Sequence, residues 1–217
     1  MRTALDRNMS MIHDDILRHA SLVNLGIERA MQAFRVFDVH LARQVVRDDD
    51  TLDSLQTKVQ KMITTTIALH QPTARDLRTL MADMLIINEL ERMGDYAESI
   101  AKTVIRHEEN PSEDIPPLLF EMAAKSRNML QKAMDAFLDG SSDLARSTAQ
   151  LDHELDSMYR QTFNMLVARM SQGDLPIEQG TYMLWTAHNL ERIGDRITDI
   201  CERIVYINTG DMYDLND

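Results

Sequence analysis

The hexapeptide Leu90-Glu-Arg-Met-Gly-Asp95 occurs a second time, with one change, as Leu190-Glu-Arg-Ile-Gly-Asp195. Each copy lies inside a long stretch whose apolar residues recur with the spacing of an amphipathic helix. Other segments recur 103 residues apart: Ala30-Met-Gln-Ala-Phe34 as Ala133-Met-Asp-Ala-Phe137, and Leu41-Ala-Arg43 as Leu144-Ala-Arg146. The sequence therefore predicts an internally duplicated helical protein, with a net loss of three residues before the last helix of the second copy.

Apolar spacing predicts six long helices, over about residues 3–37, 40–68, 74–106, 118–138, 142–171 and 177–208. Gln71-Pro-Thr73, Gly140 and Gly173-Asp-Leu-Pro176 separate them, and the Pro-rich, acidic stretch 107–117 indicates a linker. The predicted fold class is all-α, with two tandem three-helix bundles. The predicted division is 1–108 for the first repeat, 109–117 for the linker and 118–217 for the second repeat. Whether the halves pack side by side or end to end stays open.

Composition narrows the possible functions. The net charge of −12 disfavours binding to nucleic acid or to anionic lipid. Cys201 is the single cysteine, so the chain forms no internal disulfide. The sequence shows neither an apolar signal segment nor a run long enough to span a bilayer. These features predict a cytoplasmic protein that contacts a membrane only indirectly, through partners.

The predicted third helix of each repeat carries a line of acids on one face, because residues three or four apart lie above one another. The preceding helix of each repeat adds an aspartate pair. Packing such stripes together is costly unless cations lie between them. The candidate metal ligands are Asp49, Asp53, Glu91, Asp95 and Glu98 in the first repeat, and Asp152, Asp156, Glu191, Asp195 and Asp199 in the second. Oxygen ligands suit divalent or trivalent ions, with iron, zinc, magnesium, manganese and calcium not distinguished.

Several neighbours of the acids have two interpretations. Gly94 and Gly194 indicate either room for a metal cluster or close helix packing alone, since glycine inside a helix costs roughly 1 kcal/mol. His188, one turn before Glu191, is a candidate nitrogen ligand or a hydrogen-bond donor to a carboxylate, and Asn88 occupies the matching position. Arg92 and Arg192 either hold neighbouring acids in place or are ordinary surface residues. Trp185 suggests a core or interface anchor.

Catalytic motifs are not apparent in this sequence. It has no Gly-rich phosphate loop, and no histidine shows the Glu-x-x-His spacing of ferritin-like di-iron bundles. A regulatory adaptor that acts through protein contacts is the leading hypothesis. A bundle-type metalloenzyme and a metal-free helical scaffold with solvated acids are the alternatives. Exposed acid stripes also allow a homodimer bridged by shared ions.

The two Leu-Glu-Arg-x-Gly-Asp segments, together with Leu41-Ala-Arg-Gln-Val-Val46 and His70-Gln-Pro-Thr-Ala-Arg-Asp-Leu-Arg78, resemble the PhoU family over nearly the whole chain. The resemblance implies paired three-helix bundles whose acidic motifs hold multinuclear metal clusters, here on the acids named above. It implies a non-enzymatic, cytoplasmic regulator that links the phosphate-specific ABC transporter ATPase to a membrane sensor histidine kinase and represses the phosphate-starvation response. Residues 172–180 depart from the pattern, because they carry no copy of Gln-Pro-Thr-Ala-Arg-Asp-Leu.

Overall fold

The fold is known from a computed structural model, which describes residues 2–112 and 114–215. Every regular element in these ranges is a helix. The elements are α1 (Arg2–Val36), α2 (Val39–His70), α3 (Ala74–Arg106), α4 (Pro117–Asp139), α5 (Ser142–Ala149), α6 (Asp152–Gln172) and α7 (Ile177–Thr209). The predicted all-α fold class with an internal duplication is confirmed. No helix in the described part of the chain is long and apolar enough to cross a membrane.

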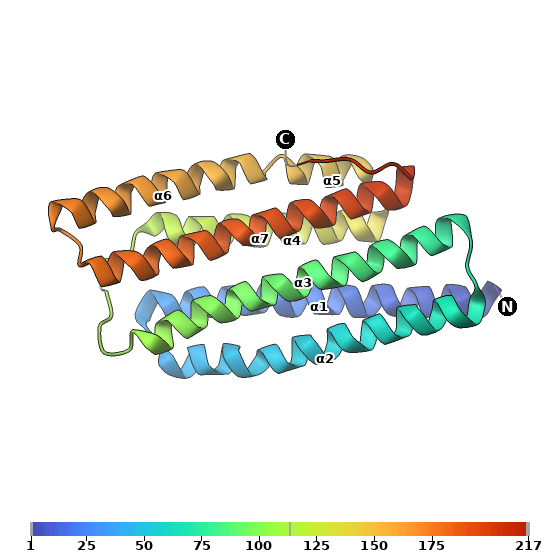
Figure 1. The fold of residues 1–217 in the computed structure, drawn as a ribbon, viewed down its shortest axis with the longest axis horizontal. Helices are drawn as coiled ribbons and strands as arrows, with labels where there is room; N and C mark the ends of the chain where they lie inside the picture. The colour runs from blue at the N-terminus through green and yellow to red at the C-terminus, as the bar shows by residue number, and fades with distance from the viewer. Residues whose placement is uncertain (1, 113, 216–217) are drawn as a thin grey trace.

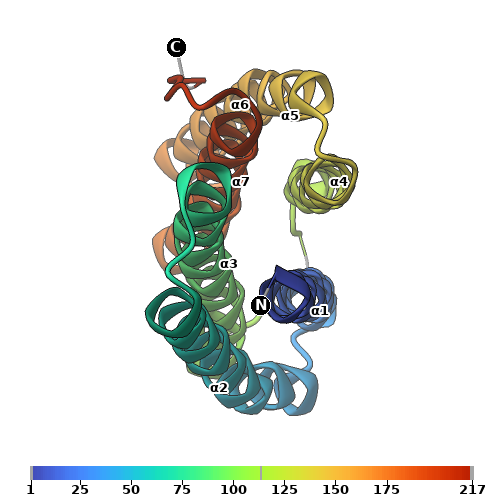
Figure 2. The same ribbon diagram turned by 90° about the vertical axis from the view of Figure 1, so that its right-hand side faces the viewer.

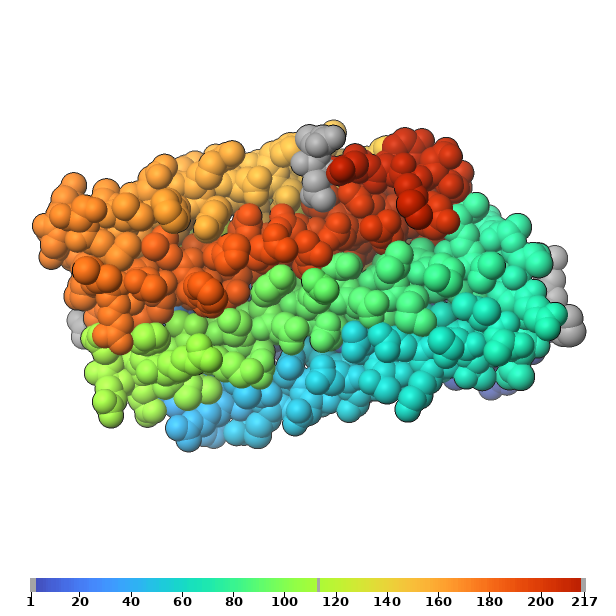
Figure 3. All heavy atoms as spheres, viewed as in Figure 1, coloured from blue at the N-terminus to red at the C-terminus, as the bar shows by residue number. Residues whose placement is uncertain are grey.

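The helices form two bundles that lie side by side, which answers the question left open by the sequence (Figure 1). Helices α1, α2 and α3 pack on one another, and α4, α5 and α6 pack around α7. The bundles join mainly along α3 and α7, which run antiparallel through the middle of the molecule. Viewed along the helices, α2, α3, α7 and α6 form one curved layer, with α1 and α4 on its concave side (Figure 2). Figure 3 shows the opposite, continuous face of that layer.

One predicted helix differs from the structure. The helix expected over 142–171 is interrupted at Gln150 and Leu151, where α5 ends and α6 begins. The acids Asp152 and Glu154 then occupy the first turn of α6, where a helix terminus favours negative charge. In the first repeat, α2 continues without a break through the matching Asp49. The two repeats therefore present their aspartate pairs from different local structures.

The core contains the apolar side chains that the spacing predicts, with Ile27, Leu90 and Leu190 fully buried. Cys201 is also fully buried, so it serves as a core residue. Gly140 and Gly173 end α4 and α6 with positive φ values of 61° and 81°, a conformation that glycine adopts without strain. Trp185 is 57% exposed, so the prediction of a core anchor is wrong and only the interface interpretation remains.

Candidate metal centre

The first repeat brings three predicted ligands together between α2 and α3. Asp49 of α2 and Asp95 and Glu98 of α3 each offer a carboxylate oxygen, and these oxygens lie within 4.8 Å of one another. We call these three residues the first cluster. Asp53 lies one turn beyond Asp49 on α2, and its charge raises the pKa values of Asp49 and Asp95. The charges of Asp95 and Asp53 likewise raise the pKa of Glu91, which lies one turn before Asp95.

The pKa values show the cost of gathering these acids. Burial, followed by the charges of Glu98, Asp53 and Asp95, raises the pKa of Asp49 from 3.8 to about 7. Burial and neighbouring carboxylates also raise the pKa values of Glu91 and Asp95. Lys102 forms an ion pair with Glu98 and offsets part of the repulsion. A proton or an added cation would relieve the remainder.

The second repeat places four matching acids, and Asp199 in addition, between α6 and α7. Burial first, and then Asp156, Asp195, Glu191 and Asp199, raise the pKa of Asp152 from 3.8 to about 7. Burial and Asp195 raise the pKa of Glu191 to about 7 as well. We call these five residues the second cluster. Arg192 Nη1 lies 2.7 Å from Asp195 Oδ2, so an arginine of α7 already neutralises part of this cluster.

The glycines of the two motifs allow the helices to approach. A β-carbon on Gly94 would lie 2.8 Å from Leu52 Cδ1 and 3.4 Å from Asp49 Oδ1. A β-carbon on Gly194 would overlap Asp152 Oδ1 and Leu155 Cδ2. Each glycine therefore faces both an apolar side chain and an acid of the neighbouring helix. Close packing and space for the carboxylate are two results of the same missing side chain.

Two buried oxygens of the second cluster have no hydrogen-bond partner among the described residues, namely Asp152 Oδ1 and Glu191 Oε2. Glu191 Oε2 lies 3.5 Å from His188 Nδ1, which is too long for a good hydrogen bond. Buried polar atoms are normally satisfied, so unpaired carboxylate oxygens favour an ion as their partner. Together with the oxygen-only donor set of the first cluster, this fits a hard cation.

The remaining predicted residues lie at the edges of the clusters. His188 is 46% exposed next to Glu191. The side-chain oxygen of Asn88, Oδ1, accepts hydrogen bonds from Gln60 and Gln56 at 2.8 and 3.3 Å. Arg92 is exposed, and its charge offsets part of the rise in the pKa of Glu91. None of these positions by itself identifies a ligand.

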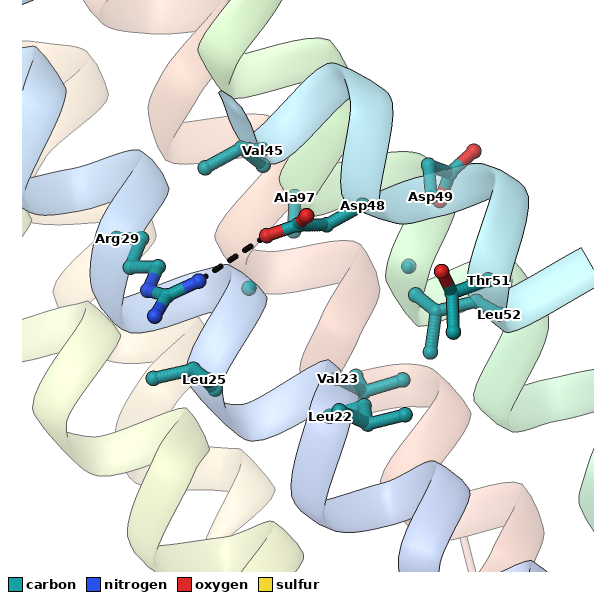
Figure 4. Close-up of a pocket in the computed structure, with 12 residues that line it drawn as sticks. Leu22, Val23, Leu25, Arg29, Val45, Asp48, Asp49, Thr51, Leu52 and Ala97 are labelled. Atoms are coloured by element: carbon teal, nitrogen blue, oxygen red, sulfur yellow. Dashed lines mark hydrogen bonds and ion pairs between the residues drawn. The ribbon is translucent and has the colours of Figure 1, made fainter. Parts of the chain in front are cut away.

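A cavity of about 260 Å³ lies beside the first cluster. Its lining comes from α1, α2 and α3 and includes Asp49, Leu52, Gly94 and Ala97. Arg29 of α1 and Asp48 of α2 form an ion pair of 3.0 Å at this cavity (Figure 4). The cavity gives Asp49 a partly apolar surrounding, which agrees with burial as the largest cause of its raised pKa.

Sequence reasoning missed a basic group that contacts the acids, Arg196, and a buried histidine that contacts Leu52. His19 is fully buried, and its Nε2 lies 3.2 Å from the backbone oxygen of Leu52, the residue packed against Gly94. Arg196 lies 2.7 Å from Asp199 Oδ2 and 3.0 Å from Glu89 Oε2. The Arg196 contact had a sequence signal, because Arg196 is four residues after Arg192 and three before Asp199. The His19 contact had none, since it depends on how α1 packs on α2.

Comparisons with known proteins agree with this architecture. The family model described as the PhoU domain matches the chain twice, over residues 16–104 and 119–204. The phosphate-specific transport system accessory protein PhoU homolog of Clostridium acetobutylicum is 33% identical over 217 residues, covering 100% of this chain and 99% of that protein. The homolog of the same name from Streptococcus pneumoniae serotype 4 is 31% identical over 216 residues, covering 100% of both chains.

Two crystal structures are also similar. The phosphate transport system regulatory protein PhoU from Streptococcus pneumoniae superposes with a TM-score of 0.90 at 30% identity, covering 97% of this chain and 99% of that one. PhoU from Pseudomonas aeruginosa gives a TM-score of 0.90 at 29% identity, covering 95% and 99%.

The fold and the acids define a class: internally duplicated helical-bundle proteins with acids facing one another between two neighbouring helices of each repeat. Within that class, the two matches to the family model and the full-length relatives are decisive. The chain belongs to the PhoU family.

Proposed function

We propose that this protein regulates phosphate uptake as a cytoplasmic adaptor, with metal ions bound at the two carboxylate clusters. The observation that carries the proposal is the end-to-end match to proteins named as accessory proteins of the phosphate-specific transport system. In this proposal the adaptor acts on the ATPase of the phosphate-specific ABC transporter and on a membrane sensor histidine kinase. When phosphate is plentiful, it represses the phosphate-starvation response.

The carboxylate geometry supports the metal part of the proposal. Two stripes of acids face each other across α2 and α3, and again across α6 and α7. In the first cluster their oxygens lie close enough to share an ion. Carboxylates so placed repel one another unless a cation or a proton neutralises them. Asp49, Asp53, Glu91, Asp95 and Glu98 would hold metal in the first repeat, and Asp152, Asp156, Glu191, Asp195 and Asp199 in the second.

An exposed aromatic patch supports the adaptor part. We define the aromatic patch as Tyr159, Phe163, Trp185 and His188, whose neighbouring rings lie 6.1–6.3 Å apart. Phe163 is 43% and Trp185 57% exposed, and aromatic residues are enriched where proteins bind one another. The first repeat carries Gln56, Gln60, Leu85 and Asn88 at the matching positions. The patch is therefore specific to the second repeat, and we propose it as a partner-binding surface.

Gene deletion tests the regulatory role. Deletion is expected to derepress phosphate-uptake genes in high-phosphate medium, and plasmid-borne wild type is expected to restore repression. A Trp185→Leu/His188→Asn variant carries the residues that the first repeat has at those positions. It is expected to fold normally and to bind the ATPase or the kinase less well in a purified pull-down. Unchanged gene expression after deletion would contradict the adaptor role.

Metal content tests the clusters separately from regulation. The untagged protein is dialysed against defined metal concentrations and its metal per chain is measured, in parallel with the Asp95→Ala/Asp195→Ala variant. The variant is expected to bind less metal, because it loses one carboxylate from each cluster. Equal metal content in the two proteins would refute the cluster assignment. Gel filtration with and without metal tests whether shared ions bridge a homodimer.

A further inference from the structure

The two clusters differ at the positions that surround the shared motif. Residues of α3 and α7 correspond at an interval of 100 in the sequence, so Tyr96 of α3 corresponds to Arg196 of α7. Glu98 corresponds to Thr198, and Ser99 corresponds to Asp199. The second repeat therefore lacks the carboxylate that completes the first cluster. It has an arginine and a displaced aspartate instead.

Arg196 is already engaged by two acids. Its Nη1 lies 2.7 Å from Asp199 Oδ2 on its own helix and 3.0 Å from Glu89 Oε2 on α3 of the other repeat. All three side chains are largely buried, with exposed fractions of 16–20%. Burial strengthens the attraction and leaves the guanidinium little room to turn away. In the first repeat the corresponding contact is a neutral hydrogen bond of 3.2 Å from Asn189 to Ser99.

A second arginine also pairs with an acid of the second cluster. Arg192 Nη1 lies 2.7 Å from Asp195 Oδ2, and a hydrogen bond with Tyr96 holds its side chain across the α3–α7 contact. Two of the five acids of the second cluster thus have an arginine within hydrogen-bond distance. Asp152 Oδ1 and Glu191 Oε2 remain buried without a hydrogen-bond partner, so part of the cluster is still open to an ion.

The first cluster also has a basic neighbour, but of a different kind. Lys102 pairs with Glu98, and its side chain is 43% exposed. A lysine at the surface keeps most of its hydration and can swing into solvent when a cation arrives. Arg196 is held from two helices and has no such alternative. The positive charge is therefore easy to displace at the first cluster and fixed at the second.

We propose that Arg196 is a built-in competitor of the metal ion at the second cluster, so that the first cluster fills at a lower metal concentration. This inference rests on the proposed metal binding and adds an unequal order of filling to it. Occupation of Asp199 by metal requires Arg196 to leave that carboxylate, which disturbs its bridge to Glu89. Filling of the second cluster is thus linked to the contact between the repeats.

Mn²⁺ titration by equilibrium dialysis tests the order of filling, because each cluster can be measured alone. Asp152→Asn/Asp156→Asn disables the second cluster, and Asp49→Asn/Asp95→Asn disables the first. With the other cluster disabled, the first is expected to bind Mn²⁺ about tenfold more tightly than the second, a difference of about 1.4 kcal/mol.

Exchange of the corresponding residues tests the role of Arg196. Arg196→Tyr, which installs the residue of the first repeat, is expected to tighten binding at the second cluster about tenfold. The reciprocal Tyr96→Arg is expected to weaken binding at the first cluster by a similar factor. Arg160→Tyr removes the same charge from an exposed position of α6. It serves as the matched control and is expected to change little, since an exposed charge is screened by salt.

Two results would overturn this inference alone. One is equal Mn²⁺ affinity of the two clusters. The other is an Arg196→Tyr protein that folds but binds Mn²⁺ no more tightly than Arg160→Tyr. Absence of Mn²⁺ binding at both wild-type clusters would overturn the proposed metal binding and this inference with it. If Arg196→Tyr does not fold, because Glu89 loses its partner, the reciprocal Tyr96→Arg variant decides. Circular dichroism of each variant identifies that case.

Discussion

Substitution of the motif glycines should affect stability in an order that the structure sets. Alanine has the higher helix propensity, so each Gly→Ala change inside a helix gains about 1 kcal/mol before packing is considered. At Gly26 of α1, the nearest atom to an added β-carbon is Ala97 Cβ at 3.8 Å, an ordinary contact. Gly26→Ala is therefore expected to stabilise the protein, and it serves as the matched control.

Gly194→Ala meets a different environment. Its β-carbon would overlap Asp152 Oδ1 and Leu155 Cδ2, and both side chains are short and buried. Overpacking of this kind typically costs about 1–3 kcal/mol. Gly194→Ala should therefore be less stable than Gly26→Ala by about 1–3 kcal/mol. Gly94→Ala should lie between them, because its β-carbon would meet one close atom, Leu52 Cδ1 at 2.8 Å, while Asp49 Oδ1 lies at 3.4 Å.

Thermal and urea unfolding in EDTA measure this order without metal. For a chain of this length, 1 kcal/mol corresponds to roughly 2–4 °C in Tm, so Gly194→Ala should melt roughly 2–12 °C below Gly26→Ala. Displacement of Asp152 should also reduce Mn²⁺ binding at the second cluster and leave the first unchanged. A Gly194→Ala protein as stable as Gly26→Ala would refute the claim that the glycine is required for helix contact and for the carboxylate.

Three further predictions concern the buried titratable groups. The pKa values of Asp49, Asp152 and Glu191 are raised to about 7, so their protonated forms favour the folded state, and their contribution is lost as the pH rises through 7. When the pH is lowered from 8 to 6.5, the free energy of unfolding of the metal-free protein should therefore rise by on the order of 1 kcal/mol. A saturating metal should remove this gain. A Tm that does not change with pH in the absence of metal would argue against the raised pKa values. His13→Ala should cost about 1–3 kcal/mol in urea unfolding, because it removes the 3.1 Å partner of the fully buried Asp83, and adding Asp83→Asn should recover part of the loss if the buried charge is the cause. In histidine NMR, His19 should stay neutral until about pH 4, because burial lowers its pKa to about 4. His13 should titrate above pH 6.5, because the hydrogen bond and charge of Asp83 outweigh the effect of burial and raise its pKa. Similar titration midpoints for His19 and His13 would contradict these two pKa shifts.

The fold could be predicted from the sequence because local and global signals agree. Apolar spacing located the helices, and the repeated intervals of 103 and 100 residues showed the duplication. The interruption at Gln150 and Leu151 was not predicted, because neither residue is a helix breaker. The side-by-side arrangement depends on the surfaces of α3 and α7, and periodicity alone does not specify which helices of two bundles meet.

The candidate site was predictable in outline only. Helical geometry placed Glu91, Asp95 and Glu98 on one face, and the repeat pointed to Asp49 on the preceding helix. Geometry along one helix cannot tell whether Arg192 and Arg196 turn toward the acids or toward solvent. That choice depends on Tyr96 and Glu89, which approach from the other repeat. The division into residues 1–108, 109–117 and 118–217 stays a prediction.

With the proposed metal binding, three kinds of positive partner would compete for the same carboxylate oxygens: a proton, a basic side chain and a metal ion. Where the pKa of a ligand lies near 7, as for Asp49, metal binding near neutral pH must release a proton, and affinity must rise with pH. Where an arginine holds the ligand, as Arg196 holds Asp199, metal must displace a charge that does not titrate, and that contact contributes no pH dependence. The duplicated fold thus places two carboxylate clusters with different competitors in one molecule. Because Asp152 and Glu191 also have pKa values of about 7, the proton competes at both clusters. The divergence at Tyr96 and Arg196 adds a competitor that does not titrate at the second cluster.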